Sequence, residues 1–458
     1  MISSDIIVAE ITPRGRGAVS TLRISGEKIA LVINQISSVA EKIISNPRKN
    51  IFAKFIANNK ELDDGLFCFY SSPKSYTGEE ILEISLHASP FIIKTALEEI
   101  LSIKGVRLAK AGEFTERAFL NGKLDLSQAE AVSDLINSES EIQARSAHEQ
   151  LNGKLSQAII ELGTPLRELA AEIEAYIDFP DEGIEPETEA GWIRRLDSSM
   201  ITLNRYIKSY QVGKIYRDGA KVSLVGLPNA GKSSLLNFLL GEDRAIVTDI
   251  PGTTRDVIEE KIIIDGYLIR LVDTAGLEIG DRKVDLVEQL GIERTMNSLK
   301  SSDLVIYLSS AEKKSEEELN LINKINELNS NVLEVQTKAD ISSDINSSSN
   351  SNNNLLSISI KDGFESSIDN LKREIIRRLS LTKRINSPII ITNIRHQQAL
   401  TDALSFLTRA YENIEDRVAP EIVTLDIRDA LNSLTEIVGA THNEDILDLV
   451  FTKFCIGK

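Results

Sequence analysis

The sequence predicts a multidomain α/β and all-α chain, in which a P-loop α/β domain is inserted into a discontinuous helical domain that follows an N-terminal α+β domain. Three observations predict this arrangement. A glycine-rich pattern at 226–233 stands between a strand-like and a helix-like run. Apolar residues recur with helical spacing on both sides of this region. Strand and helix patterns are mixed over the first 120 or so residues. We therefore expect domains at 1–120, 121–215 joined with 381–458, and 216–380.

The N-terminal domain is expected to contain several strands. Alternating or β-rich runs at 5–11, 18–24, 67–70 and 81–86 predict strands, and residues 90–101 have helical spacing. These patterns favour an α+β domain.

Helical spacing then runs from residue 125 to about 210, with a break at 179–183, and it returns over 391–454. Because an inserted unit is tolerated when its ends lie close together, the two stretches can form one helical domain. Within the inserted domain, residues 342–354 are polar and of low complexity, which predicts a loop.

Composition and charge limit the classes of partner. The chain has 458 residues, a net charge of −17 and two cysteines, Cys68 and Cys455, which form no metal-binding pattern. No signal peptide and no apolar run of ~20 residues is present, so we expect a cytoplasmic protein without a membrane anchor. An acidic chain can contact RNA only through a local basic patch or a basic partner. Candidates for such a patch, or simply solvated helix faces, are Arg194, Arg195, Lys208, Lys214, Arg217, Lys221, Arg377, Arg378, Lys383, Arg384 and Arg395.

The glycine-rich pattern is a complete phosphate loop, Gly226-Leu-Pro-Asn-Ala-Gly231-Lys232-Ser233. Its backbone N–H groups and the positive end of the following helix suit phosphate oxygens. Lys232 would reach the β- and γ-phosphates, and the Ser233 hydroxyl would hold Mg²⁺.

Downstream motifs in the expected order indicate that the nucleotide is GTP. Asp273-Thr-Ala-Gly276 follows a strand-like run, where a carboxylate meets the Mg²⁺ shell, and Thr254 is a candidate switch threonine on the metal. In Thr337-Lys338-Ala339-Asp340, the Asp340 carboxylate can accept hydrogen bonds that guanine offers and adenine does not. Ser359-Ile-Lys361 suits the last base-contacting loop. Together these motifs predict a Ras-like P-loop GTPase domain.

The residue that orients water is not evident from these motifs. Leu277 occupies the position where many GTPases carry glutamine, so another residue must orient the attacking water. The Asn229 side chain can either help to hold a K⁺ beside the phosphates or hydrogen-bond the loop backbone. The chemistry of the residues leaves both possibilities open.

Segments outside the GTPase motifs carry a resemblance to a known family. They are Thr12-Pro-Arg-Gly-Arg-Gly17, Ser75-Tyr-Thr-Gly-Glu79, the run from Gly112-Glu-Phe-Thr-Glu to Lys123-Leu-Asp-Leu126, and the ending Cys455-Ile-Gly-Lys458. Along nearly all of its length the chain resembles the MnmE (TrmE) family of tRNA-modifying GTPases.

This resemblance implies an N-terminal domain similar to tetrahydrofolate-binding domains, which forms a homodimer. A formyl- or methylene-tetrahydrofolate would bind there as the one-carbon source. Its matching contacts here are Arg23, Glu83, Lys123 and Lys458.

The resemblance also implies a reaction and a partner. With the flavoprotein MnmG, which carries FAD and uses NADH, the family adds an aminomethyl or carboxymethylaminomethyl group to carbon five of the wobble uridine of certain tRNAs. Hydrolysis in the family depends on K⁺ and on the two GTPase domains meeting. This implies a K⁺ cage of Asn229, Thr248, Ile250 and Thr253, and Glu288 as the water-orienting residue.

Combining motifs and resemblance gives the expected sites. Mg²⁺ would be held by Ser233 and Thr254. The GTP-contacting set is Asn229, Ala230, Gly231, Lys232, Ser233, Ser234, Thr248, Asp249, Ile250, Pro251, Gly252, Thr253, Thr254, Asp273, Thr274, Ala275, Gly276, Thr337, Lys338, Asp340, Ser359, Ile360 and Lys361. The alternative function is a GTP-switched ribosome-assembly or RNA-binding factor. An acidic chain with a folate-type N-terminal domain argues against it.

The sequence departs from the family pattern in a few positions. Thr337 stands where the family usually has Asn, and a hydroxyl can take over part of the bracing role of that amide. His87-Ala-Ser89 and Ala111 replace the family's His-Gly-Gly and Pro near the expected folate pocket.

Overall fold

The protein is described by a computed structural model, which forms two compact units. The first unit comprises Met1–Ser133, Gln150–Glu161 and Leu431–Lys458, and the second comprises Asp134–Glu149 and Leu162–Ala430. The residues described are 5–178, 189–243, 259–273, 296–309, 316–337, 355–359, 365–381, 389–440, 444–452 and 454–458.

A six-stranded sheet forms the centre of the first unit, in the order β3-β4-β5-β2-β1-β6. All neighbours are antiparallel except β1 and β6, which are parallel. The strands are β1 (Ile6–Glu10), β2 (Val19–Gly26), β3 (Ile51–Ala57), β4 (Lys60–Tyr70), β5 (Glu80–His87) and β6 (Val106–Leu108).

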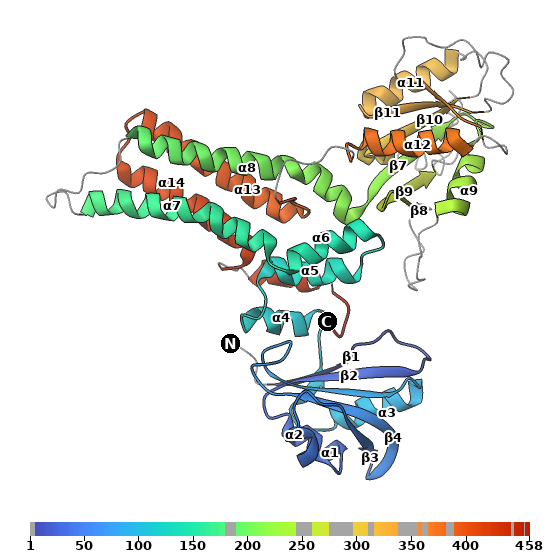
Figure 1. Ribbon diagram of the computed structural model, residues 1–458, viewed down its shortest axis with the longest axis vertical. Coiled ribbons are helices and arrows are strands. Elements are labelled where there is room, and N and C mark those ends of the chain that lie inside the picture. Colours follow the sequence, from blue (N-terminus) through green and yellow to red (C-terminus); the bar gives the residue numbers. More distant parts are fainter. Residues whose placement is uncertain are drawn as a thin grey trace, which may run out of the picture. The chain divides into compact units, whose positions relative to one another are not determined.

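The two faces of this sheet differ in what covers them. Side chains such as Leu22, Ile24 and Phe67 point to one face, where they belong to a hydrophobic core. This core also contains side chains of α1 (Ala30–Ile36), α2 (Ala40–Ile44) and α3 (Pro90–Leu101), whose ribbons are labelled in Figure 1. Because side chains alternate along a strand, Arg23 and Glu83 point to the opposite face. A smaller cluster there includes Ile7 and the Phe114 side chain of α4 (Glu113–Leu120).

The start of α5 (Leu126–Ile136) is fixed by a reciprocal cap. The Gln128 N–H donates to Asp125 Oδ1, and the Asp125 N–H donates to Gln128 Oε1, both at 2.9 Å. Two N–H groups at the helix start are thereby satisfied by side chains, as in a capping box.

A second six-stranded sheet lies in the second unit, in the order β12-β11-β10-β7-β9-β8 (Figure 1). Only the β8–β9 pair is antiparallel, so the other strands end at the same edge of the sheet. The strands are β7 (Ala220–Gly226), β8 (Glu259–Ile264), β9 (Tyr267–Asp273), β10 (Leu304–Ser309), β11 (Val332–Gln336) and β12 (Leu355–Ser357). The helices named within this region are α9 (Lys232–Asp243), α11 (Glu316–Leu328) and α12 (Glu365–Arg378).

Further helices precede and follow this α/β region in the sequence. They are α6 (Glu141–Leu151), α7 (Lys154–Asp178), α8 (Glu189–Asp218), α13 (Ile394–Glu415), α14 (Pro420–Val438) and α15 (Glu444–Phe451). Near the end of α8 the backbone approaches the start of the second helical stretch: a Cβ on Gly213 would lie 2.0 Å from the Ile391 carbonyl oxygen. Only glycine permits this approach.

Most elements expected from the sequence are present in the described residues. The helix expected at 90–101 is α3, and the strand expected at 332–336 is β11. The strands β3, β6, β8, β10 and β12 were not expected from the pattern. The loop expected at 342–354 lies outside the described residues. None of the described helices is long and apolar enough to cross a membrane.

Candidate functional site

The phosphate loop joins the end of β7 to the start of α9, at the edge where the parallel strands end. A Cβ on Gly226 would lie 2.5 Å from the Leu308 carbonyl oxygen of β10, so only glycine fits there. Gly231 has φ +91°, a conformation that side chains disfavour. These two glycines set the path of the loop, and ligands of α/β sheets bind at this edge.

The two residues that begin α9 offer the expected polar groups. The Lys232 ammonium donates to the carbonyl oxygens of Gly226 and Leu227, at 2.5 and 3.3 Å, and so lies over the loop. Ser233 and Ser234 are in the first helical turn, and both are exposed. A hydroxyl is a hard oxygen ligand, so Ser233 fits Mg²⁺, and the loop with Lys232 fits phosphate.

Thr337 connects the phosphate loop to the end of β11. Its buried hydroxyl lies 2.9 Å from the Ala230 carbonyl oxygen and 3.1 Å from that of Ser309, and it can donate to either. Its main-chain N–H also donates to the Ser309 carbonyl oxygen. The hydroxyl therefore contacts the phosphate loop across the sheet edge.

Ser359 lies beyond the end of β12 and is buried. The Ser367 hydroxyl of α12 accepts from the Ser359 N–H at 3.3 Å and can donate to the Ser359 carbonyl oxygen at 3.2 Å. The phosphate loop, Thr337 and Ser359 therefore all lie at the same edge of the second sheet.

Other expected nucleotide contacts fall outside the described residues. They are Thr248, Asp249, Ile250, Pro251, Gly252, Thr253, Thr254, Thr274, Ala275, Gly276, Glu288, Lys338, Asp340, Ile360 and Lys361. Asp273 ends β9, and only its backbone is described. Asn229 is exposed at φ +65°, so its two possible roles stay open.

In the first unit, two of the expected folate contacts form an ion pair. Arg23 of β2 stands opposite Glu83 of β5, and its Nε donates to Glu83 Oε1 at 2.9 Å. The two side chains are 16% and 24% exposed. A ligand on this face would therefore meet a preformed, partly accessible pair.

Aromatic rings surround this pair. The Arg23 guanidinium lies 5.2 Å from the centre of the Tyr76 ring and 5.6 Å from that of Phe114. The Tyr70 hydroxyl donates to Glu83 Oε2 at 3.4 Å. Hydrogen bonding with Cys68 and burial raise the pKa of Tyr70, and burial raises that of Tyr76, so both remain neutral donors. Flat rings beside a guanidinium–carboxylate pair fit a flat, amide-bearing ring such as a pterin.

The aromatic members of this cluster were not expected from the sequence. Tyr76 and Phe114 lie inside motifs used for the resemblance, yet no spacing connects them to Arg23. The only available signal was that two aromatic residues stood in segments rich in polar residues.

The C-terminal segment, with Lys458, lies beside α4. Ile456 forms an antiparallel bridge with Ala111, and the Phe114 N–H donates to the Lys458 carbonyl oxygen at 3.2 Å. Gly457 has φ +102°, and a Cβ there would lie 2.5 Å from the Glu10 carbonyl oxygen. The backbone of Lys458 is thereby held next to Phe114.

Lys123, the fourth expected contact, follows α4. Its ammonium donates to the Pro73 carbonyl oxygen at 3.1 Å, in the loop that also carries Tyr76. The structure thus brings Arg23, Glu83 and the Lys458 backbone around Phe114, and it places Lys123 on the neighbouring loop.

A buried charge network fixes α4 to the sheet. Arg117, whose side chain is 5% exposed, pairs with Asp5, Glu79 and Glu113. Arg107 also pairs with Glu113. Burial alone would raise the pKa of Glu113, but hydrogen bonds from Arg107, the Lys110 N–H and Arg117 lower it overall.

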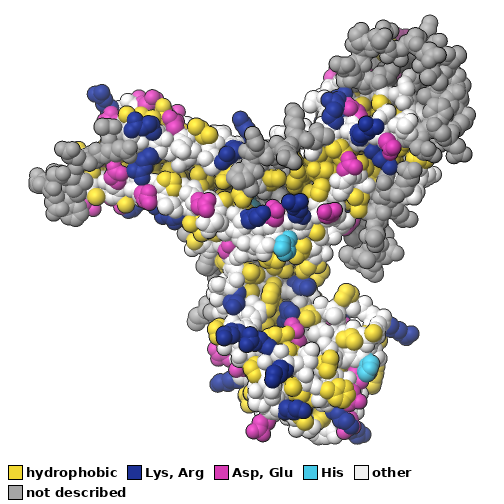
Figure 2. Space-filling model, viewed as in Figure 1, with side chains coloured by type: hydrophobic (Ala, Val, Ile, Leu, Met, Phe, Trp, Pro, Cys, Tyr) yellow, Lys and Arg dark blue, Asp and Glu magenta, His cyan; other side chains and the backbone are white. Residues whose placement is uncertain are grey.

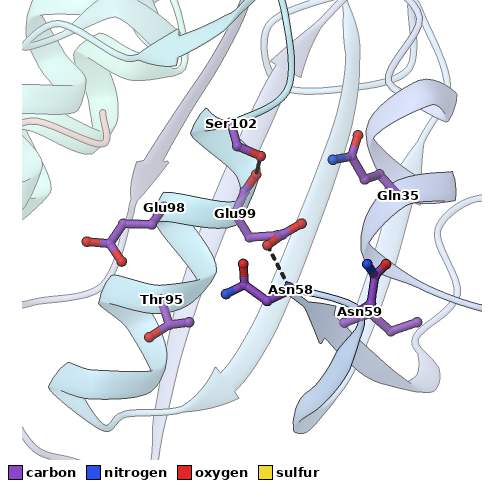
Figure 3. Close-up of a pocket in the computed structure, with 8 residues that line it drawn as sticks. Gln35, Asn58, Asn59, Thr95, Glu98, Glu99 and Ser102 are labelled. Carbon is purple, nitrogen blue, oxygen red and sulfur yellow. Dashed lines mark hydrogen bonds between the residues drawn. The ribbon is translucent and has the colours of Figure 1, made fainter.

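A polar cavity lies apart from the expected sites (Figure 3). It has a volume of about 410 Å³ and is lined by residues that include Gln35 of α1, Asn58 and Asn59 of the β3–β4 turn, and Glu98 and Glu99 of α3. The Asn58 N–H donates to Glu99 Oε2 at 2.9 Å. None of the expected folate contacts lines this cavity.

The chain is similar to known proteins along nearly its whole length. A family model described as the GTP-binding protein TrmE N-terminus matches residues 6–123, and the MnmE helical domain model matches residues 126–455. The tRNA modification GTPase MnmE of Aquifex aeolicus is 40% identical over 457 residues, covering 99% of each chain. That of Clostridioides difficile is 40% identical over 468 residues, covering 100% of each.

Among solved structures, the G domain of the T. maritima FeoB iron transporter is 26% identical, covers 35% of this chain and 98% of its own, and has a TM-score of 0.27. The chain belongs to the MnmE (TrmE) family of tRNA modification GTPases.

Proposed function

We propose that this protein is a K⁺-dependent GTP hydrolase that takes part in modifying the wobble uridine of certain tRNAs. The observation that carries the proposal is full-length similarity, at about 40% identity, to curated tRNA modification GTPases, together with a phosphate loop of the required geometry. The reaction is the addition of an aminomethyl or carboxymethylaminomethyl group to carbon five of the base.

The nucleotide is held at the carboxyl edge of the second sheet. The loop N–H groups and Lys232 bind the phosphates, and Thr337 keeps the loop and the base-recognition segment in register. Asp340 selects guanine. Mg²⁺, held by Ser233 and Thr254, would neutralise charge on the phosphates.

Hydrolysis requires a group that orients water, because Leu277 has no polar side chain. We assign this role to Glu288. K⁺, held by Asn229, Thr248, Ile250 and Thr253, would supply the positive charge that an arginine finger provides in other GTPases. The two GTPase domains of a homodimer would meet for this step.

The one-carbon unit would come from a formyl- or methylene-tetrahydrofolate on the face of the first sheet that carries Arg23 and Glu83. The preformed ion pair and the Tyr76 and Phe114 rings support this placement, because they offer flat surfaces and paired polar groups to a pterin. Lys123 and Lys458 would contact the acidic tail of the folate. The flavoprotein MnmG, with FAD and NADH, would supply the redox chemistry.

The hydrolytic part of the proposal is tested by GTP turnover of the purified protein in KCl and in NaCl, with Glu288→Ala and Glu278→Ala measured alongside. We expect turnover to be largely lost in NaCl. We also expect it to be lost in Glu288→Ala while nucleotide binding is retained, and to be kept in Glu278→Ala. Equal rates in both salts would remove the K⁺ mechanism, and full activity of Glu288→Ala would remove the assigned role.

A further inference from the structure

Most basic residues that the sequence nominated for RNA contact are engaged by neighbouring side chains. Arg195 pairs with Glu172 at 2.8 Å, Arg217 with Asp134 at 2.9 Å, and Arg378 with Glu374 at 3.1 Å. Lys383 and Arg384 lie outside the described residues. These side chains therefore make a weak case for a polyanion-binding patch.

A different set of cations lies at one end of the first sheet. It comprises exposed side chains from four loops, which we call the basic rim: Lys28, Arg48, Lys49, Lys74 and Lys123. Lys28 follows β2, Arg48 and Lys49 precede β3, and Lys74 lies between β4 and β5.

Strand register explains why loops so distant in sequence meet. Gly26 at the end of β2 stands opposite Glu80 at the start of β5. Ile81 pairs with Tyr70 at the end of β4, and Phe67 pairs with Ile51 at the start of β3. Neighbouring strands are ~4.8 Å apart, so β2 and β3 are separated by about 14 Å along this end of the sheet. Several phosphates of a nucleic acid strand fit along that length.

The charges of the rim are not neutralised by side chains of the described residues. No ion pair involves Lys28, Arg48, Lys49 or Lys74 there, and Lys123 donates to the Pro73 carbonyl oxygen. Acidic residues at this end are already engaged: Glu79 pairs with Arg117, and Glu80 accepts from the Ile29 N–H. The exposed Glu27 is the exception among the flanking loops.

The overall charge distribution points to the same part of the chain. Residues 1–123 contain 16 Lys and Arg against 14 Asp and Glu, whereas the remaining residues contain 36 against 55. Figure 2 shows Lys and Arg side chains on the visible face of the body built from β1–β6. Because the remaining residues are strongly acidic, a polyanion would be repelled less by residues 1–123 than by the rest of the chain.

We propose that the basic rim docks the sugar-phosphate backbone of the tRNA substrate, next to the candidate folate site. This inference rests on the proposed function. The loop that carries Lys74 also carries Tyr76, whose ring lies against Arg23, so RNA on the rim is adjacent to the one-carbon donor. Lysine and arginine contacts to phosphate position RNA without reading its sequence.

The test is tRNA binding to the full-length protein as a function of KCl concentration. The variant replaces three rim residues that are not expected to contact folate, Lys28→Gln, Lys49→Gln and Lys74→Gln. The matched control replaces three exposed lysines of the same domain outside the rim, Lys54→Gln, Lys60→Gln and Lys94→Gln. Thermal unfolding of both verifies that they are folded.

Each lost phosphate contact lowers the slope of log affinity against log salt by about 0.7 to 0.9. We expect the slope of the rim variant to fall by about 2 to 3 and that of the control to stay at the wild-type value. Equal slopes for the rim variant and the wild type would overturn the proposal.

Binding of triglutamyl-tetrahydrofolate is measured on the same variants. If the rim variant loses affinity for this ligand and keeps the wild-type tRNA slope, the rim serves the folate tail and the RNA proposal is wrong. A wild-type protein that binds no tRNA at any salt concentration would also overturn the docking proposal. Failure of the proposed function is distinguished from this result by the GTP turnover measurements described above.

Discussion

The Thr337 side chain connects the end of β11 to the phosphate loop and to β10. The hydroxyl lies within hydrogen-bonding distance of the Ala230 and Ser309 carbonyl oxygens, and both the threonine and Ala230 are buried. A buried acceptor that loses its donor costs about 1–3 kcal/mol. The side chain is therefore expected to affect nucleotide binding through the position of the phosphate loop.

We predict that Thr337→Ala weakens GDP binding by roughly tenfold, since about 1.4 kcal/mol corresponds to a factor of ten. The measurement is the dissociation constant of a fluorescent GDP analogue. Thr337→Ser, which keeps the hydroxyl, should bind nearly as tightly as the wild type. An alanine variant with unchanged affinity would show that the hydroxyl has no bracing role.

Gly457 sets the path of the C-terminal segment. Its φ is +102°, and a Cβ at this position would lie only 2.5 Å from the Glu10 carbonyl oxygen, so alanine cannot be accommodated without movement. We predict that Gly457→Ala releases this segment, and that limited proteolysis then removes it several times faster. Ile456→Ala keeps the backbone bridge and serves as the control. Equal cleavage rates for the two variants would contradict this prediction.

At the scale of elements, α4 is held by buried charges as well as by apolar contacts. Arg117 pairs with carboxylates from the chain start, the β4–β5 loop and α4 itself. Such a buried network stabilises the fold only while its carboxylates are ionised.

Acid is expected to weaken this network. The pKa of Glu113 is lower in the folded protein than its ordinary value of 4.5, so its contribution to stability is present above that value and is lost as the pH falls through the folded pKa. We predict that the calorimetric unfolding temperature of the domain containing α4 falls more steeply below about pH 4.5 in the wild type than in Glu113→Gln. If the unfolding temperatures of the wild type and of Glu113→Gln fall with pH in the same way, the network does not stabilise this domain as predicted.

Elements with clean periodicity could be predicted from the sequence, and those without it could not. Residues 90–101 have helical spacing and a proline at the first turn, and they form α3 as expected. In β3, the outward-facing Phe52 and Ile56 obscure the alternation of Ile51, Ala53 and Phe55. β6 has only three residues, too few to show a period.

The candidate sites also differ in how much of each could be predicted from the sequence. The phosphate loop is contiguous, so its glycines, Lys232 and Ser233 were evident from a motif. The cluster of Tyr76 and Phe114 around Arg23 depends on strand pairing and on the position of α4, neither of which spacing reveals. The same holds for the basic rim, whose members come from four separate loops.

At the scale of the whole molecule, the chain combines a nucleotide-binding α/β region with a distinct α+β region that holds both the candidate folate face and the C-terminal segment. The family membership covers all of these parts together. We infer that GTP hydrolysis in the nucleotide-binding α/β region serves tRNA modification.

The most direct test is nucleoside analysis by mass spectrometry of tRNA from bacterial cells that lack their own protein of this family. The cells express either this chain or its Lys232→Ala variant, at matched levels verified by immunoblotting. We predict that the wild-type chain restores the modified wobble uridine and that the variant, which has lost the phosphate-binding ammonium, does not. Unmodified uridine in cells that express a GTP-hydrolysing wild-type chain would contradict the account.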